Sequence, residues 1–342
     1  MLALIAWVYG KIVALRNYLY DRAVLDTFDL GARTISIGNI TTGGTGKTPL
    51  VAYVADVLAE RGEKVCILTR GYGREYAKKR VLVSDGEQIL SDVAAAGDEP
   101  FELAQKLLGK AIVIADADRV SAAEWARRKF GITAFVLDDG FQHRRAKRDV
   151  NIVCIDATDP FGGGEMLPAG RLRERIANLR RADAIVITRS DLVDDISNLK
   201  SEISDLANEG CVLFTAENHV SEIIELKESH AKTQRTQRRK KAAKPGTKVF
   251  AFSGIGNPEN FFEMLRREGF NVAATKEFRD HHVYTRPDTL EIETLARKAG
   301  AEVLLTTAKD AVKLLNSRFE LDCFVVEMDV KIDDAEMLAA ML

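Results

Sequence analysis

The sequence has few cysteines, and their spacing does not match the metal sites that cysteine pairs usually build. Only 4 of the 342 residues are cysteine. They lie far apart, mostly within apolar runs that suit β-strands, and no Cys-x-x-Cys pair or Cys/His zinc spacing occurs. The four are Cys66, Cys154, Cys211 and Cys323. We therefore expect buried thiols in a protein of a reducing compartment.

The chain also lacks an excess of charge of either sign. Its net charge is −2, with 46% hydrophobic and 29% charged residues, which is the composition of a folded soluble protein. This balance does not favour nucleic-acid binding, and no protein partner is indicated. Because 342 residues exceed the usual size of one domain, we expect two packed units, although one large α/β domain would also fit.

An uninterrupted apolar run long enough to cross a bilayer is absent from the N-terminus. A span needs roughly 20 apolar residues, and Lys11, Arg16, Asp21 and Arg22 interrupt this one. No basic segment precedes it, so a spanning helix and a secretion signal are both disfavoured. One stripe at helical spacing consists of Ile5, Val8, Ile12, Leu15 and Leu19, with Trp7, Tyr9, Tyr18 and Tyr20 around it. The stripe predicts a helix in a membrane interface, or one that packs this stripe on the protein's own core.

Short β-branched runs alternate with helical patterns along the rest of the chain. Buried strands separated by helices predict an α/β fold with a doubly wound, mostly parallel sheet. Ligands of such sheets bind at the carboxyl ends of the strands. The predicted strands are 34–37, 64–68, 111–115, 133–137, 152–155, 184–188, 212–214, 249–253, 303–306 and 323–326.

A basic segment at 229–248 breaks this alternation. Its sequence, SHAKTQRTQRRKKAAKPGTK, has almost no large apolar residue. It is either a solvated linker or a segment attracted to anionic lipid headgroups through Arg235, Arg238, Arg239, Lys240 and Lys241. We accordingly expect an N-terminal amphipathic helix at 1–30, a P-loop core at 31–228, this linker, and a smaller C-terminal α/β lobe at 249–342.

The strongest chemical signal is a glycine-rich segment between a predicted strand and a predicted helix. It reads GNITTGGTGKT over 38–48, with Thr41 where the common P-loop pattern has glycine. Glycines let backbone N–H groups curl around phosphate oxygens, and the helix N-terminus favours their charge. Lys47 can reach the β- and γ-phosphates, and the Thr48 hydroxyl can bind Mg²⁺. The candidate nucleotide-binding residues are Gly43, Gly44, Thr45, Gly46, Lys47 and Thr48.

Two acidic residues stand where the predicted sheet would present its ligand-binding edge. Asp138 and Asp139 open the string DDGFQH directly after the predicted strand 133–137. One of them should bind Mg²⁺ as the Walker B acid. Alternatively, the pair forms a turn or caps a helix, and without the P-loop this motif would not decide between the two.

Two further polar motifs lie elsewhere in the chain. In GDEP at 97–100, Asp98 either caps a helix or accepts a proton from an acceptor hydroxyl during phosphoryl transfer. In FRDHHVY at 278–284, adjacent histidines point in different directions, so at most one faces a shared site. No third ligand lies at a characteristic metal spacing. A histidine near Asp98 could instead orient that base.

Taken together, these motifs resemble the tetraacyldisaccharide 4′-kinase family, the lipid A kinases that phosphorylate a glucosamine disaccharide carrying four acyl chains. The likeness covers nearly the whole chain, and the family has the same form of P-loop with threonine at position 41. The matching segments are 38–49, 70–73, 97–100, 138–143, 148–157, 161–175, 254–262, 278–284 and 306–314.

The resemblance implies an ATP- and Mg²⁺-dependent kinase that phosphorylates the 4′-hydroxyl of a tetraacyldisaccharide 1-phosphate in lipid A biosynthesis. It implies a peripheral or monotopic enzyme at the cytoplasmic face of the bacterial inner membrane, with the lipid-linked disaccharide and an anionic membrane surface as its partners. The implied roles are Asp98 as general base, His281 as its partner, Lys47 as phosphate clamp, and Thr48, Asp138 and Asp139 as the Mg²⁺ site. Arg119, Arg173 and Glu174 would line the cleft, and Lys309 and Asp310 belong to a family motif of unassigned role.

Three other P-loop functions compete with this one. A partitioning-type ATPase switch usually carries a signature lysine just before its paired glycines, where this chain has Thr41 and Thr42. A GTPase would need Thr188-Arg-Ser-Asp191 to act as the guanine-reading N-K-x-D pattern, but Arg189 replaces the lysine. A cytosolic small-molecule kinase differs only in its acceptor.

Overall fold

The structure is a computed structural model that describes residues 1–75, 77–226, 243–315 and 317–342. Most of the basic segment, including the five arginines and lysines named above, lies outside these ranges. Its two alternative roles therefore stay predictions.

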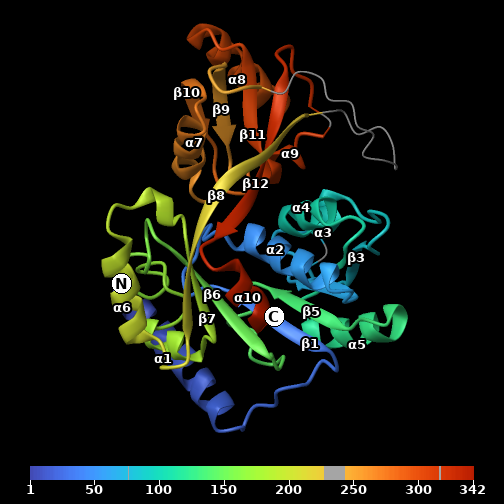
Figure 1. Ribbon diagram of the computed structural model, residues 1–342, viewed down its shortest axis with the longest axis vertical. Helices are drawn as coiled ribbons and strands as arrows, with labels where there is room; N and C mark the ends of the chain where they lie inside the picture. The colour runs from blue at the N-terminus through green and yellow to red at the C-terminus, as the bar shows by residue number, and fades with distance from the viewer. Residues whose placement is uncertain (76, 227–242, 316) are drawn as a thin grey trace.

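One sheet runs through both lobes of the molecule (Figure 1). Within the described ranges it has 12 strands, in the order β10-β9-β11-β12-β8-β7-β6-β1-β5-β2-β4-β3. Neighbouring strands are parallel except for two antiparallel pairs, β3 with β4 and β8 with β12. The predicted α/β fold with a mostly parallel sheet is therefore confirmed.

The elements follow the predicted alternation of strands and helices. The strands are β1 (Arg33–Gly38), β2 (Val65–Thr69), β3 (Val81–Ser84), β4 (Ala111–Ala115), β5 (Ala134–Asp138), β6 (Val150–Asp156), β7 (Ala184–Thr188), β8 (Val212–Glu225), β9 (Lys248–Ser253), β10 (Asn271–Glu277), β11 (Val303–Thr307) and β12 (Cys323–Ile332). The helices are α1 (Leu2–Asp21), α2 (Lys47–Glu60), α3 (Val93–Ala96), α4 (Asp98–Lys106), α5 (Arg119–Phe130), α6 (Ile196–Leu206), α7 (Pro258–Arg267), α8 (Arg286–Ala299), α9 (Ala308–Ala311) and α10 (Ala335–Met341), with short 3₁₀ helices η1 (Ile176–Arg181) and η2 (Ser190–Leu192).

Helices cover both faces of the sheet in the larger lobe, and they bury its central strands along their whole length. On one face, Leu58 of α2, Leu103 of α4 and Leu338 of α10 share a core with β1, β2 and β5. On the other face, Ala126 of α5 and Ile203 of α6 belong to two further clusters. Strands β1, β5 and β7 are parallel, so their carboxyl ends lie at the same edge of the sheet, where α/β folds bind their ligands.

Two long strands join the larger lobe to the smaller one. Strand β8 is parallel to β7 over residues 212–216 and then continues past the edge of the larger lobe. Over 216–225 it pairs with β12, which runs back in the opposite direction (Figure 1). Because both strands belong to the same sheet, backbone hydrogen bonds between strands continue from one lobe into the other.

The end of the chain packs on the larger lobe, not on the smaller one. Leu338 and Leu342 are buried in the same cluster as α2. Nη2 of Arg33 also donates to the backbone oxygen of Met341 at 3.0 Å. The predicted extent of the smaller lobe, 249–342, is therefore wrong at its end, since residues after β12 complete the core of the first lobe.

Helix α1 turns the predicted apolar stripe outward. It packs on the larger lobe through Ala6, Gly10, Val13 and Asn17, a face of small or medium-sized residues spaced three and four apart. The predicted stripe faces solvent instead, with exposed fractions of 48% for Ile5, 44% for Val8, 62% for Ile12 and 59% for Leu15. The stripe therefore does not pack on the protein's own core. By length and composition alone, this helix of 20 residues would also be able to cross a membrane.

Candidate active site

The glycine-rich segment forms a loop between the end of β1 and the start of α2. Gly43 and Gly46 have φ of 109° and 73°, which a residue with a Cβ adopts only with strain. Gly46 immediately precedes Lys47, the first residue of α2, so the loop ends at a helix N-terminus. The structure thus has the strand, loop and helix that a phosphate-binding loop needs.

Pairing with a distant segment explains why the loop has Thr41 where the common pattern has glycine. The backbone N–H of Thr42 donates to the oxygen of Arg171 at 2.7 Å, and Thr41 forms a β-bridge with Leu172. The Arg171 guanidinium also donates to the Thr42 oxygen, at 2.8 Å. A backbone held in extended pairing does not need glycine, and β-branched threonine suits it.

The two carboxylates at the end of β5 have different partners. Asp139 accepts two hydrogen bonds from Arg173, at 2.6 and 2.9 Å, and lies 3.8 Å from Nζ of Lys47. Asp138 is buried and accepts a hydrogen bond from Oγ1 of Thr69 at 2.9 Å. Both carboxylates therefore lie beside the phosphate-binding loop. The positively charged groups of Arg173 and Lys47 lie against Asp139.

These contacts separate the pKa values of the two carboxyl groups. Burial, together with Glu99 and Asp139, raises the pKa of Asp138 to about 6. Burial acts on Asp139 in the same direction, but the hydrogen bond from Arg173 and the charge of Lys47 outweigh it and hold its pKa well below the usual range. At neutral pH Asp139 is firmly ionised, whereas Asp138 takes up a proton in mildly acidic solution.

Asp98 and His281 come from different lobes and contact each other. Nδ1 of His281 lies 2.8 Å from Oδ2 of Asp98 and 3.1 Å from Oδ1. Asp98 is 7% exposed and is the first residue of α4, whose N-cap position is Gly97. The alternative role of Asp98 as the helix cap is therefore wrong. His282 takes no part in this contact and stacks on Phe278, with ring centroids 4.7 Å apart.

Opposite charges around Asp98 favour its ionised form. Burial tends to raise the pKa of Asp98, but the hydrogen bond with His281 and the charges of Lys309 and Lys313 outweigh it, so the pKa is lowered. The same hydrogen bond raises the pKa of His281 against the effect of burial. The pair therefore places an ionised carboxylate against an imidazole ring.

Two lysines surround the Asp98–His281 pair. Nζ of Lys309 lies 3.1 Å from Oδ1 of Asp280 and 3.3 Å from Oε1 of Glu99. Nζ of Lys313 lies 3.7 Å from Oδ2 of Asp98. Lys309 thus bridges α4 and the loop that carries His281, so it has a definite place beside the site.

Several residues at the site received no role, or a different one, in the sequence analysis. Lys313 and Thr188 were not singled out for the site, although Oγ1 of Thr188 donates to the oxygen of Thr45 at 3.0 Å. Asp310 is fully buried and accepts hydrogen bonds from Ser253, Gly254 and Thr307, which is a structural role.

Glu174 does not line the cleft, because it is 0% exposed and accepts a hydrogen bond from Asn17 of α1 at 2.8 Å. Arg119 donates to the backbone oxygen of Asp138 at 2.9 Å.

The two lobes meet at the phosphate-binding loop. A Cβ added to Gly256, in the loop after β9, would lie 3.0 Å from the backbone nitrogen of Gly44 and 3.4 Å from Oδ2 of Asp280. A side chain at this position would crowd the phosphate-binding loop, because the two backbones approach closely. The phosphate-binding loop and the Asp98–His281 pair therefore border the same region between the lobes.

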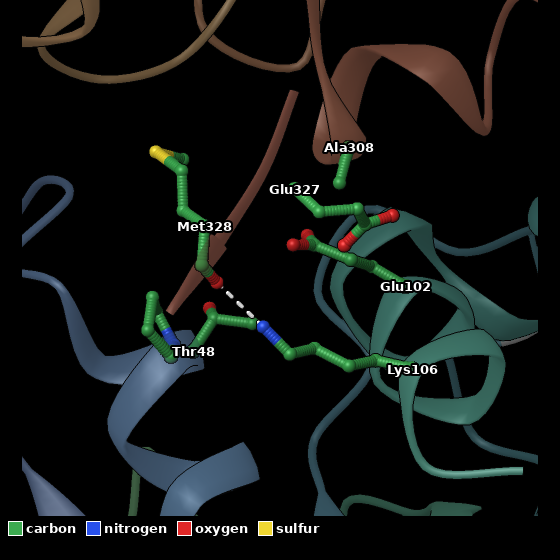
Figure 2. Close-up of a pocket in the computed structure, with 7 residues that line it drawn as sticks. Thr48, Glu102, Lys106, Ala308, Glu327 and Met328 are labelled. Carbon is green, nitrogen blue, oxygen red and sulfur yellow. Dashed lines mark hydrogen bonds between the residues drawn. The ribbon is translucent and has the colours of Figure 1, made fainter. Parts of the chain in front are cut away.

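A small pocket beside the first turn of α2 lies between helix α4 and the joining strand β12 (Figure 2). Its volume of about 10 Å³ leaves room for about one water molecule, and Thr48 lies on its wall. Nζ of Lys106 donates to the backbone oxygen of Met328 at 2.5 Å. Figure 2 shows the side chains of Glu102 and Glu327 in this same pocket. Burial, with the charge of Glu327, raises the pKa of Glu102 to about 8.

Comparisons with known proteins agree with this geometry. The family model LpxK, tetraacyldisaccharide-1-P 4′-kinase, matches residues 1–342. The chain belongs to the tetraacyldisaccharide 4′-kinase family. The predicted family is thereby confirmed, and with it the class of enzyme, a kinase with an alcohol acceptor in lipid A biosynthesis.

Individual relatives match over most of their length. A tetraacyldisaccharide 4′-kinase of Halothermothrix orenii is 38% identical over 330 residues, which cover 95% of this chain and 85% of the relative. One of Geobacter metallireducens is 39% identical, covering 92% of this chain and 88% of the relative. The crystal structure of LpxK from Aquifex aeolicus in complex with ATP is 31% identical, with a TM-score of 0.75, and covers 98% of this chain and 96% of that one. Both lobes of this tetraacyldisaccharide 4′-kinase family member therefore have counterparts in a solved structure.

Proposed function

We propose that this protein transfers the γ-phosphoryl group of ATP directly to the 4′-hydroxyl of a tetraacyldisaccharide 1-phosphate, with Asp98 as the general base. The observation that carries the proposal is the position of the Asp98–His281 pair, which borders the same interlobe region as the phosphate-binding loop. A hydroxyl bound in this region would have a base on one side and a phosphoryl donor on the other. Such positioning provides most of the catalysis in phosphoryl transfer.

Asp98 has the properties of a proton acceptor. Its carboxylate is ionised at neutral pH, and the ring of His281 fixes its orientation. It takes the proton of the 4′-hydroxyl as the oxygen attacks the γ-phosphorus and ADP leaves. General-base catalysis of this kind contributes roughly 10²- to 10⁴-fold to the rate.

Lys47 and the residues around it form the donor side of the site. Lys47 begins α2, where its ammonium group and the helix N-terminus both favour phosphate oxygens. Arg173 neutralises Asp139 through two hydrogen bonds, which limits repulsion between that carboxylate and the nucleotide. We assign binding of the triphosphate to this loop, from Gly43 to Thr48.

The residues beside the loop fit a magnesium ion. Thr48 offers a hydroxyl, and Asp138 and Asp139 offer carboxylate oxygens, which are the ligands that Mg²⁺ prefers. Asp138 is buried next to two other carboxyl groups, Glu99 and Asp139, and its raised pKa reflects a negative charge that a cation would relieve. When bound, Mg²⁺ would neutralise charge on the β- and γ-phosphates.

Helix α1 has the form of a monotopic anchor. Its exposed apolar stripe suits the interface of a membrane whose lipids hold the substrate's acyl chains. Tyr9 donates a hydrogen bond to the backbone oxygen of Arg173 at 3.1 Å, and Asn17 donates one to the buried Glu174. A helix that crossed the bilayer would lose these contacts with the lobe that carries the site. We therefore place the enzyme at the cytoplasmic face of the inner membrane, lying on the bilayer.

Labelled ATP tests the proposal directly. The purified protein is incubated with γ-labelled ATP, Mg²⁺ and detergent-dispersed tetraacyldisaccharide 1-phosphate, and label is expected in the lipid at its 4′-position. Asp98→Asn should abolish most of this transfer while the nucleotide still binds. Hydrolysis of ATP without labelled lipid would indicate an ATPase switch. In a parallel incubation with a deacylated, water-soluble disaccharide, label in that sugar alone would indicate a cytosolic kinase. Either result would overturn the proposal.

A further inference from the structure

Lys313 places a buried ammonium group between two carboxylates from different lobes. It follows α9 in the smaller lobe, and its side chain is 8% exposed. Its Nζ lies 3.3 Å from Oδ1 of Asp310 in the same lobe and 3.7 Å from Oδ2 of Asp98 in the larger lobe. Among the residues that the structure describes, this Nζ makes no hydrogen bond. Burial of a charge is costly unless opposite charges lie beside it, so the two carboxylates are what offsets this cost.

One oxygen of Asp310 is fixed by hydrogen bonds, and the other is left for the lysine. Oδ2 accepts from Oγ of Ser253 at 3.0 Å, from the backbone N–H of Gly254 at 3.0 Å and from Oγ1 of Thr307 at 2.7 Å. Oδ1 accepts no hydrogen bond from any described residue and is the oxygen paired with Lys313. The three donors hold the carboxylate at the ends of β9 and β11. It is therefore a counter-ion of fixed position.

The same carboxylate also holds the loop that carries His281. Gly254 donates its backbone N–H to Asp310, and its backbone oxygen accepts from the N–H of His281 at 3.2 Å. A Cβ added to Gly254 would lie 3.1 Å from Oδ1 of Asp310, so the backbone approaches this carboxylate closely. Asp98 thus meets two groups of the smaller lobe, the ring of His281 and the ammonium of Lys313, and Asp310 anchors both.

Lys313 differs from Lys309, the other lysine beside the base. Nζ of Lys309 lies 3.1 Å from Oδ1 of Asp280 and 3.3 Å from Oε1 of Glu99, so its charge is shared with carboxylates other than the base. Within the described ranges, Lys313 pairs with no carboxylate besides the base and Asp310. Of the two lysines, Lys313 is therefore the one whose charge is directed at the base.

We propose that Lys313 is a positioning residue for phosphoryl transfer, which holds Oδ2 of Asp98 beside His281 and is itself held by Asp310. The inference rests on the proposed role of Asp98 as general base and adds the group that orients it. Lys313 takes no part in the proton transfer. When Asp98 accepts the proton of the 4′-hydroxyl and becomes neutral, the ammonium keeps Asp310 as its partner, so no buried charge is left unpaired.

A double-mutant cycle tests whether Lys313 acts through the base. With the full chain, ATP, Mg²⁺ and detergent-dispersed tetraacyldisaccharide 1-phosphate, kcat is measured for wild type, Lys313→Met, Asp98→Asn and the variant with both substitutions. Lys313→Met should lower kcat at least about tenfold, because displacement of a catalytic group by about 1 Å can cost roughly 10²-fold in rate. The dissociation constant of ATP should stay unchanged. The doubly substituted protein should be no slower than Asp98→Asn, because the lysine then has no base to position.

Two further variants separate positioning from folding. Lys313→Met leaves Asp310 without its cation, whereas Lys313→Met combined with Asp310→Asn removes both charges and should melt no lower than the single variant. Its kcat should stay as low as that of Lys313→Met, because the base still lacks its cation. The matched control is Lys298→Met, at an exposed lysine of α8 in the same lobe, which should keep the kcat and melting temperature of wild type.

The outcomes distinguish this inference from the proposed function. A wild-type kcat in Lys313→Met, or losses that multiply when Lys313→Met and Asp98→Asn are combined, would overturn the positioning role and leave the kinase proposal intact. Recovery of kcat in Lys313→Met with Asp310→Asn would also overturn it, because the ion pair would then act on folding alone. Absence of labelled lipid with the wild-type protein, or normal turnover in Asp98→Asn, would instead overturn the proposed function.

Discussion

Asp98 and His281 are each held in place by local backbone geometry. Asp98 follows Gly97, whose φ is 90°, so the chain turns sharply before the carboxylate enters the site. His281 has a φ of 61°, which costs a non-glycine residue roughly 1–3 kcal/mol. The backbone N–H of His281 donates to the oxygen of Gly254 at 3.2 Å, which helps to hold this conformation. The loop thus holds His281 in a conformation in which its ring contacts Asp98.

Replacing the base should reduce turnover without removing the nucleotide. We expect Asp98→Asn to lower kcat at least about 10²-fold, because the amide cannot accept the hydroxyl proton. The KM for ATP should change little, since Asp98 makes no contact with the phosphate-binding loop. Steady-state kinetics with lipid acceptor measures both constants. His282→Gln is the control and should retain its kcat, and normal turnover in Asp98→Asn would contradict the assignment.

A titration of Glu102 should make the stability of the free enzyme depend on pH. The groups that face it are Glu327 on β12, Lys309 on α9, and Glu99 and Lys106 on α4. Its pKa is about 8 in the folded state against an ordinary 4.5, so the folded protein keeps a proton that the unfolded chain releases between these values. Wild-type stability should therefore fall as pH rises through this window.

The isosteric variant removes this titration. Glu102→Gln stays neutral at every pH, so its stability relative to wild type should rise from about pH 5 to about pH 9. Denaturant unfolding of the nucleotide-free protein measures the difference. Glu263→Gln, on the surface of α7, should show the same difference from wild type at both pH values. A difference for Glu102→Gln that does not change with pH would contradict the raised pKa.

Individual site residues were predictable to the extent that they belonged to compact motifs. The phosphate-binding loop, Asp138, Asp139 and the choice of His281 came from short strings of sequence, and the structure brings them to one interlobe region. Lys313 reaches Asp98 only through tertiary packing, and no local pattern marks it. The ion pair between Arg267 and Asp191 likewise could not be predicted, because the two residues are far apart in the chain.

One face of helix α1 packs on the larger lobe and the other is exposed and apolar, so substitutions can change the exposed face alone. We expect simultaneous replacement of Val8, Ile12 and Leu15 by serine to raise the KM for lipid presented in vesicles, because these side chains are exposed and apolar. The KM for ATP and the melting temperature should stay near wild type, since none of the three is buried in the core. Kinetics on vesicles and thermal unfolding measure these effects. Unchanged lipid kinetics would contradict a membrane role for this stripe.

Strands in the interior of the sheet were predicted, and the two edge strands were not. All ten predicted strands occur, because each is a β-branched or apolar segment bounded by turns or helices. Strands β3 and β10 were missed, since each lies at an edge of the sheet and is only partly buried. The length of β8 was underestimated, since its second half, from Glu217, is largely polar and pairs with β12 outside the larger lobe.

At the scale of the whole molecule, α10 is the element that closes the larger lobe. Leu338 is fully buried, whereas its neighbour Met337 is 45% exposed. We expect Leu338→Ala to lower the free energy of unfolding by about 2–5 kcal/mol, the usual cost of truncating a buried leucine. Met337→Ala should cost less than about 0.5 kcal/mol. Denaturant unfolding gives both values, and equal effects of the two substitutions would contradict this packing.

The order of elements along the chain has a consequence for biosynthesis. Strands β9, β10 and β11 follow β8 and precede β12 in the chain, so the smaller lobe that contains them is an insertion into the larger one, to which α10 returns after β12. Proteins generally begin to fold from the N-terminus while they are being made. A ribosome must therefore synthesise the whole inserted lobe before α10 can cover the leucine- and valine-rich side of the first lobe. Until then that side stays open to water and to chaperones.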